Sequence, residues 1–146
     1  MFASQTSVPV EKSIEEIRVF LTKIGTEGFS FAAYDGDAYL AFSFQGKAVK
    51  MCFKIPVHPG KEATIAQMKK YEQARRSKWR QILLCIKAKF ECVLCELETF
   101  EQAFLAHIIL KDGEKLGDVA MRLISDIPDK EIPGHLGFSK KKLKTA

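Results

Sequence analysis

Four basic side chains with regular spacing are the first feature of this sequence that could do chemistry. They are Lys69, Arg76, Arg80 and Lys87. At about 100° per residue on a helix, these four positions fall within about 40° of one another. Cations repeated at roughly 5–6 Å per turn can follow a phosphate backbone. The alternative is a solvated helix flank whose long side chains lie along an apolar seam.

A second candidate site lies on the outward face of the strands expected between residues 29 and 55. Tyr39, Lys50 and Lys54 fall on this face, together with Tyr34 and several serines and alanines. Aromatic rings can stack on bases, and lysines can hold the phosphates between them. Tyrosine and lysine also suit any solvated strand face, and a partner subunit is a further alternative occupant.

The cysteines do not indicate a metal site. Cys92 and Cys95 have a zinc-ligand spacing, but such sites need a second ligand pair, which the three histidines do not supply. With Cys85, these thiols lie on one side of an expected helix, so we expect them to be reduced. Small side chains there would let the C-terminal helix, or another copy of the chain, approach closely.

No catalytic constellation is evident. The sequence has no glycine-rich phosphate loop, nucleophile elbow or His-Glu-x-x-His pattern. His107 is expected at a core or helix boundary, and Asp35 and Asp37 flank a turn glycine. The sequence therefore predicts no catalytic residues, no cofactor and no enzymatic activity.

An N-terminal helix and three strands are expected to position these residues. Ser13 and Glu16 fit a capping box, which predicts that a helix begins at Ser13, and Gly25 should end it. Two-residue turns at Asp35-Gly36 and Gln45-Gly46 predict an antiparallel meander. The pairs expected from period-two alternation are Phe31 with Leu40, Phe29 with Phe42, Phe42 with Val49 and Leu40 with Met51.

A long helix is expected from about Glu62 to about Leu97, with an apolar stripe. The stripe consists of Trp79, Ile82, Leu83, Ile86, Phe90, Val93, Leu94 and Leu97. A capping box at Thr99 predicts a further helix, with Phe100, Phe104, Leu105 and Ile108 on its apolar face. Residues 119–124 fit either a short last helix or a docked strand.

These elements predict one α+β domain over residues 1–127 and a flexible basic tail over residues 128–146. Of the 146 residues, 47% are hydrophobic and 28% are charged, as in ordinary globular proteins. The net charge of +5 is concentrated in residues 61–97 and in the lysines between Lys140 and Lys144. No apolar run approaches the ~20 residues of a membrane span, and no signal peptide is evident, so we expect a cytoplasmic protein.

Three segments carry a resemblance to known proteins. Residues 6–13, 79–91 (with the pattern W-R-x-x-L-L-x-I-K-A-K-x-E) and 99–108 resemble a family of small phage- and prophage-borne proteins. The similarity extends to about Gly117, and the lysine-rich tail departs from it. It implies a mobile-element origin and carries over no functional residues.

The order of helix, three-strand meander and long helix is also similar to the core of phage single-strand annealing proteins. Those proteins form rings or filaments that hold single-stranded DNA. The same order resembles the double-stranded-RNA-binding domain, but the second helix here is longer and lacks that domain's basic cluster.

The hypothesis that follows is a non-enzymatic, homo-oligomeric protein that binds nucleic acid, preferably single-stranded DNA, in replication or recombination. Two alternatives remain. One is a small adaptor or inhibitor that binds a host or phage protein, and the other is a virion assembly component.

Overall fold

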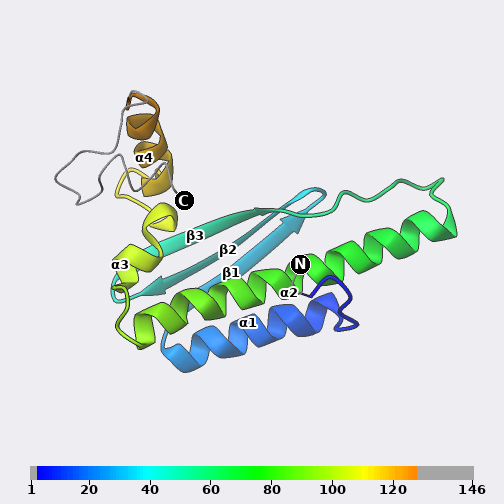
Figure 1. The fold of residues 1–146 in the computed structure, drawn as a ribbon, viewed down its shortest axis with the longest axis horizontal. Helices are drawn as coiled ribbons and strands as arrows, with labels where there is room; N and C mark the ends of the chain where they lie inside the picture. The colour runs from blue at the N-terminus through cyan, green and yellow to red at the C-terminus, as the bar shows by residue number, and fades with distance from the viewer. Residues whose placement is uncertain (1–2, 128–146) are drawn as a thin grey trace, which may run out of the picture.

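The computed structural model describes residues 3–127 and contains the predicted order of elements (Figure 1). The elements are α1 (Val10–Ile24), β1 (Glu27–Tyr34), β2 (Asp37–Phe44), β3 (Lys47–Lys54), α2 (Ile65–Leu94), α3 (Phe100–Ala103), the 3-10 turn η1 (Leu105–His107) and α4 (Leu116–Ser125). The predicted α+β class is confirmed. The tail predicted over residues 128–146, including Lys140 to Lys144, lies outside the described residues.

Helix α1 begins earlier than the sequence predicted. It starts at Val10 after Pro9, whose carbonyl oxygen accepts the Ser13 N–H at 3.2 Å. Ser13 is therefore inside the first turns and fully buried, and its hydroxyl has no hydrogen-bond partner within residues 3–127. The prediction of Ser13 as the cap is wrong because burial of Val10 extends the apolar face by one turn. Gly25 ends the helix in the left-handed conformation, as predicted.

The sheet has the order β1-β2-β3, and most of the predicted register is confirmed. Phe31 pairs with Leu40, and Leu40 and Phe42 pair with Met51 and Val49. The predicted pairing of Phe29 with Phe42 does not form, because the ladder shifts between Glu27 and Ser30. Gly28 lies there with a φ of 64°, which fits a β-bulge that inserts an extra residue.

The turn between β2 and β3 places a glutamine, Gln45, in the left-handed region of backbone conformation. Gln45 and Gly46 have φ of 50° and 76°, the pattern of a type I′ turn. Glutamine tolerates the left-handed region poorly, whereas Asn-Gly is the preferred pair. Gln45→Asn is therefore expected to raise the free energy of unfolding by about 0.5–1 kcal/mol, measured by urea denaturation. Asp35→Asn in the other turn is the control; an equal gain there would contradict the explanation, because Asp35 does not have a positive φ.

The core lies between the inward face of the sheet and the helices α1 and α2. Along α2, the predicted apolar stripe is buried from Trp79 to Phe90. Leu94 and Leu97 were predicted to continue it, but they are 62% and 76% exposed. Val93 is partly buried against the core, and the stripe ends there because α2 ends at Leu94 and Glu96, with φ of 60°, turns the chain toward α3.

Phe90 is the centre of an aromatic cluster that joins the layers. Its ring centroid lies between 4.9 and 6.2 Å from those of five other phenylalanines. These are Phe20, Phe42, Phe44, Phe100 and Phe104. The cluster therefore connects α1, the sheet, α2 and α3 through one side chain.

The segment after α2 covers part of one sheet edge. The Thr99 capping box with Gln102 is confirmed, and Phe100 and Phe104 are buried. Leu105, predicted on the same apolar face, is half exposed because the helix gives way to η1. Ile108 then bridges to Val49 on β3. Residues 116–125 form helix α4, which decides between the helix and strand alternatives and has no buried residue.

Candidate nucleic-acid interface

The start of α2 is fixed by a capping box. Thr64 accepts the Gln67 N–H, and the Gln67 side chain accepts the Thr64 N–H, so the helix begins at Ile65 rather than near Glu62. This Thr-x-x-Gln pattern is the sequence signal that would have placed the boundary. It also fixes the helical phase of the basic residues that follow.

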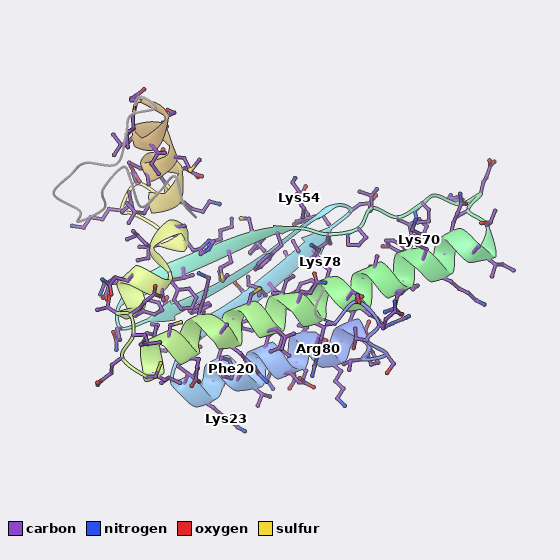
Figure 2. All side chains as sticks on the ribbon, in the orientation of Figure 1. Phe20, Lys23, Lys54, Lys70, Lys78 and Arg80 are labelled. Carbon is purple, nitrogen blue, oxygen red and sulfur yellow. The ribbon has the colours of Figure 1, made fainter. Side chains whose placement is uncertain are left out.

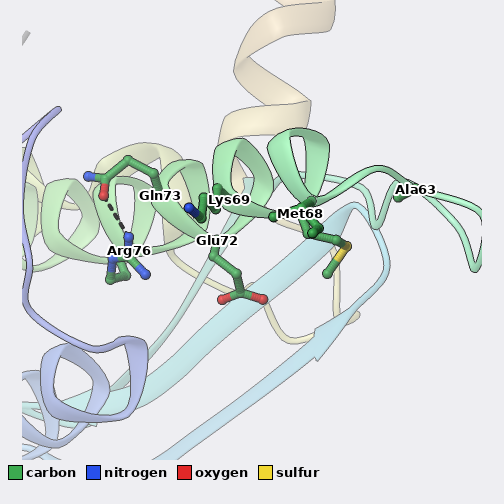
Figure 3. A pocket seen from close by; sticks show the side chains of 7 residues that line it. Ala63, Met68, Lys69, Glu72, Gln73 and Arg76 are labelled. Atoms are coloured by element: carbon green, nitrogen blue, oxygen red, sulfur yellow. Dashed lines mark hydrogen bonds between the residues drawn. The ribbon is translucent and has the colours of Figure 1, made fainter.

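Lys69 and Arg76 lie in the N-terminal half of α2, beside a shallow hollow lined by Met68, Glu72 and Gln73 (Figure 3). Lys69 is exposed. Arg76 is half-buried and donates from Nη2 to Gln73 Oε1 at 2.6 Å. Its Nε is buried with no partner within the described part of the chain. Lys69 is therefore free to meet a ligand, whereas the Arg76 head is oriented by its own helix.

Arg80, labelled in Figure 2, lies at the seam between α2 and α1. Lys87 lies beside α1 residues at the same seam. Arg80 Nη1 lies 2.6 Å from Glu16 Oε2, and the two side chains are only 25% and 33% exposed. Lys87 Nζ lies 5.8 Å from the centroid of the Phe20 ring. Because Glu16 neutralises Arg80 and the pair bridges two helices, Arg80 is not a clean probe of ligand binding.

Two further lysines of α2 line one hollow beside the N-terminal segment. Lys70 and Lys78 line a hollow with Ser4 and Pro56, and Figure 2 labels both on the same helix. The Ser77 hydroxyl, beneath the segment, donates to Ser4 O at 2.9 Å. Helical periodicity could not place this group together, because residues far from α2 in sequence complete it.

The outward face of the sheet is open. None of its side chains is buried, whereas Ala38, Leu40, Phe42, Val49 and Met51 on the inward face are. The outward side chains are Ser30, Ala32, Tyr34, Asp37, Tyr39, Ala41, Ser43, Ala48, Lys50, Cys52 and Lys54.

Aromatic rings and lysines lie next to one another on this face. Tyr39 pairs with Ala32 and Cys52, and Lys50 Nζ lies 4.5 Å from the centroid of the Tyr39 ring. Tyr34 is 72% exposed. It lies diagonally across from Tyr39, at the ~7–8 Å spacing of such neighbours on adjacent strands.

Lys54 is held at the end of the same face by Asp37. Its Nζ lies 2.6 Å from Asp37 Oδ1, and both side chains are exposed. The hydrogen bond from this ammonium to the carboxylate raises the pKa of Lys54 above its ordinary value. Lys54 is therefore charged at neutral pH, but an exposed pair such as this one exchanges readily with another anion.

The two predicted groups of site residues lie on opposite sides of the sheet. Phe42 contacts Phe90 of α2 on the inward face, with centroids 6.0 Å apart. Tyr39 and Lys50 alternate with the inward residues and therefore face away from α2. The structure does not bring the α2 cations and the sheet residues into one surface.

Within residues 3–127, no group of three or more His, Cys, Asp or Glu side chains is placed to hold a metal ion. The pKa of His107 is lowered by burial and by the charges of Lys89 and Lys115. Cys85 and Cys95 are exposed and reduced on the outer side of α2, where no described element covers them. None of the described helices is both long and apolar enough to span a membrane.

No family is assigned by comparison with known proteins. No protein-family model matches the sequence, no curated protein matches it and no solved structure matches the fold. The resemblance to small phage-borne proteins therefore stays a prediction, and the site's own chemistry is the basis for inferring a function.

Proposed function

We propose that this chain is a non-enzymatic protein that binds single-stranded nucleic acid, preferably DNA, on the outward face of its sheet. One observation carries the proposal: the face is open along its width and presents Tyr34 and Tyr39 beside Lys50 and Lys54. Stacking on aromatic side chains tolerates any base sequence, and neighbouring cations hold the backbone. A duplex hides its bases from such a platform, so single strands are preferred.

The α2 cations support the proposal less directly. Arg80 is neutralised by Glu16, and Arg76 is bonded to Gln73. Lys69 and Lys87 remain exposed, but they lie on the other side of the sheet from the tyrosines. They provide a matched comparison, because removing two lysines from either side changes the net charge equally.

The test is fluorescence anisotropy with labelled single-stranded and double-stranded oligonucleotides at two salt concentrations. We expect the folded wild-type protein to prefer the single strand and to lose affinity as salt rises. Lys50→Gln with Lys54→Gln should weaken binding and reduce the slope of log affinity against log salt by about 1.4. Lys69→Gln with Lys87→Gln should leave binding nearly unchanged.

Replacing Tyr34 by alanine tests stacking separately from charge. We expect a loss of about 1–3 kcal/mol in binding free energy with little change in salt slope. If the helix variant loses binding and the sheet variants do not, the interface is α2 and the sheet proposal is wrong. No binding by folded wild-type protein at low salt would overturn the nucleic-acid proposal.

A second candidate function is docking to another protein through α4. Although α4 has no buried residue, it exposes Met121, Leu123 and Ile124, with Ile127 beyond its end. Such an exposed apolar group is typical of protein-binding surfaces. If this function is correct, the chain binds a partner protein through α4 rather than through the sheet, and the affinity changes little with salt concentration.

A further inference from the structure

The two edges of the sheet are not equivalent. On β3, Val49 bridges to Ile108, and the Ile109 N–H donates to Ala48 O at 2.9 Å. The rest of that strand carries Lys50 and Lys54. The free edge of β1 pairs with no other strand within residues 3–127. Among the described strands, only β1 therefore offers an edge that no other described segment occupies along its whole length.

β1 also lacks the features that protect natural sheet edges. It has no buried residue, whereas β2 has three and β3 has two. Phe31 is 46% exposed although it faces the core side of the sheet. From Gly28 to Tyr34 the strand has no charged residue and no proline, the devices that usually prevent edge-to-edge pairing. The one irregularity is the bulge near Gly28, which leaves residues 30–34 regular.

We propose that β1 pairs antiparallel with β1 of a second copy of this chain, about a two-fold axis at Ala32. The register follows from backbone geometry. Tyr34 and Asp37 close a two-residue turn, and alternate residues of an antiparallel strand direct their backbone groups to opposite sides. Phe31 and Ala33 therefore direct their N–H and C=O groups outward, and an axis at Ala32 places Phe31 opposite Ala33 of the second copy.

Side-chain sizes favour this register over registers that are shifted along the strand. On the core side, each Phe31 meets an alanine, so the exposed ring is covered without a clash. On the outward side, Tyr34 meets Ser30, again large against small. A shift that places Phe31 opposite Phe31 would run the pairing into the bulge near Gly28.

Charge favours the antiparallel direction. Glu27 is the only ionised side chain of β1. In the antiparallel pair the two Glu27 residues lie at opposite ends, about 30 Å apart at the rise of a strand. That separation exceeds the ~8–10 Å screening length at physiological salt. A parallel pair would place the two carboxylates side by side.

The proposed dimer has a continuous six-stranded sheet and is independent of the nucleic-acid proposal. Its interface is one short strand per copy, so we expect association in the micromolar range. A two-fold edge contact closes on itself, so assembly should stop at two.

The test is size-exclusion chromatography with light scattering on the full chain from low to high micromolar concentration. We expect wild-type protein to pass from monomer to dimer. Ala33→Lys places a cation on the core side of the β1 edge and should hold the protein as a monomer with an unchanged unfolding midpoint. Ala48→Lys adds the same charge to an exposed position of β3 and should leave the dimer intact.

Hydrogen exchange on wild-type protein gives a second readout that needs no variant. The amides of Phe31 and Ala33, which point outward from the sheet, should exchange more slowly at high protein concentration, while those of residues 50–54 should not change. A wild-type monomer throughout, a dimer that survives Ala33→Lys, or equal loss with Ala48→Lys would each overturn the proposal. A ring of more than two copies would also overturn it.

Discussion

Replacing Phe90 with alanine is expected to lower the free energy of unfolding by about 3–5 kcal/mol, the range for a large buried aromatic side chain. Phe90 is fully buried and contacts five other phenylalanine rings from α1, the sheet and the α3 region. Its loss leaves a cavity where these elements meet, and the rings around it cannot all move inward together. The measurement is urea denaturation followed by circular dichroism.

Leu94→Ala is the matched control, because it removes a large apolar side chain one turn later on α2. Leu94 is 62% exposed, so its replacement should change the free energy of unfolding by less than about 0.5 kcal/mol. Equal destabilisation by the two substitutions would mean that Leu94 is covered, which would contradict its exposure at the end of α2.

Replacing Trp79 with alanine should cost a similar ~3–5 kcal/mol at the other end of the core. Trp79 is 2% exposed, and its ring lies edge-on to Phe31 with centroids 6.3 Å apart. Circular dichroism is again the probe, since this substitution removes the only tryptophan.

Trp79→Phe distinguishes the effect of lost side-chain volume from the effect of losing the aromatic contact with Phe31. The smaller ring keeps part of the packing against Phe31, so it should cost clearly less than alanine. Near-wild-type stability of Trp79→Ala would contradict the burial of the ring and the helical phase that places it inward.

Much of the fold follows from local patterns in the sequence. Period-two alternation and two short turns predict four residue pairs, and three of them are confirmed. The register is strongly specified because a one-residue slip would expose every core side chain of a strand. The α2 stripe from Trp79 to Phe90 and the Thr99 capping box are likewise confirmed. Each of these signals depends on residues that lie close together in the sequence.

The incorrect predictions lie where distant segments compete with local signals. Ser13 has a good capping pattern, but burial of Val10 against the core moves the helix start upstream. The bulge near Gly28 removes the pair predicted between Phe29 and Phe42. Leu94 continues the stripe in sequence, yet no described element lies over it.

For the candidate site, too, some features follow from the sequence and others only from the tertiary structure. The sequence determined that Tyr39, Lys50 and Lys54 share one strand face, since alternation alone fixes that. It also placed Lys69 and Lys87 on one helix flank. Only the tertiary structure decided that these two groups lie on opposite sides of the sheet, and that Glu16 neutralises Arg80. The physical reason is that periodicity fixes the direction of a side chain within its own element, whereas its neighbours depend on how separate elements dock.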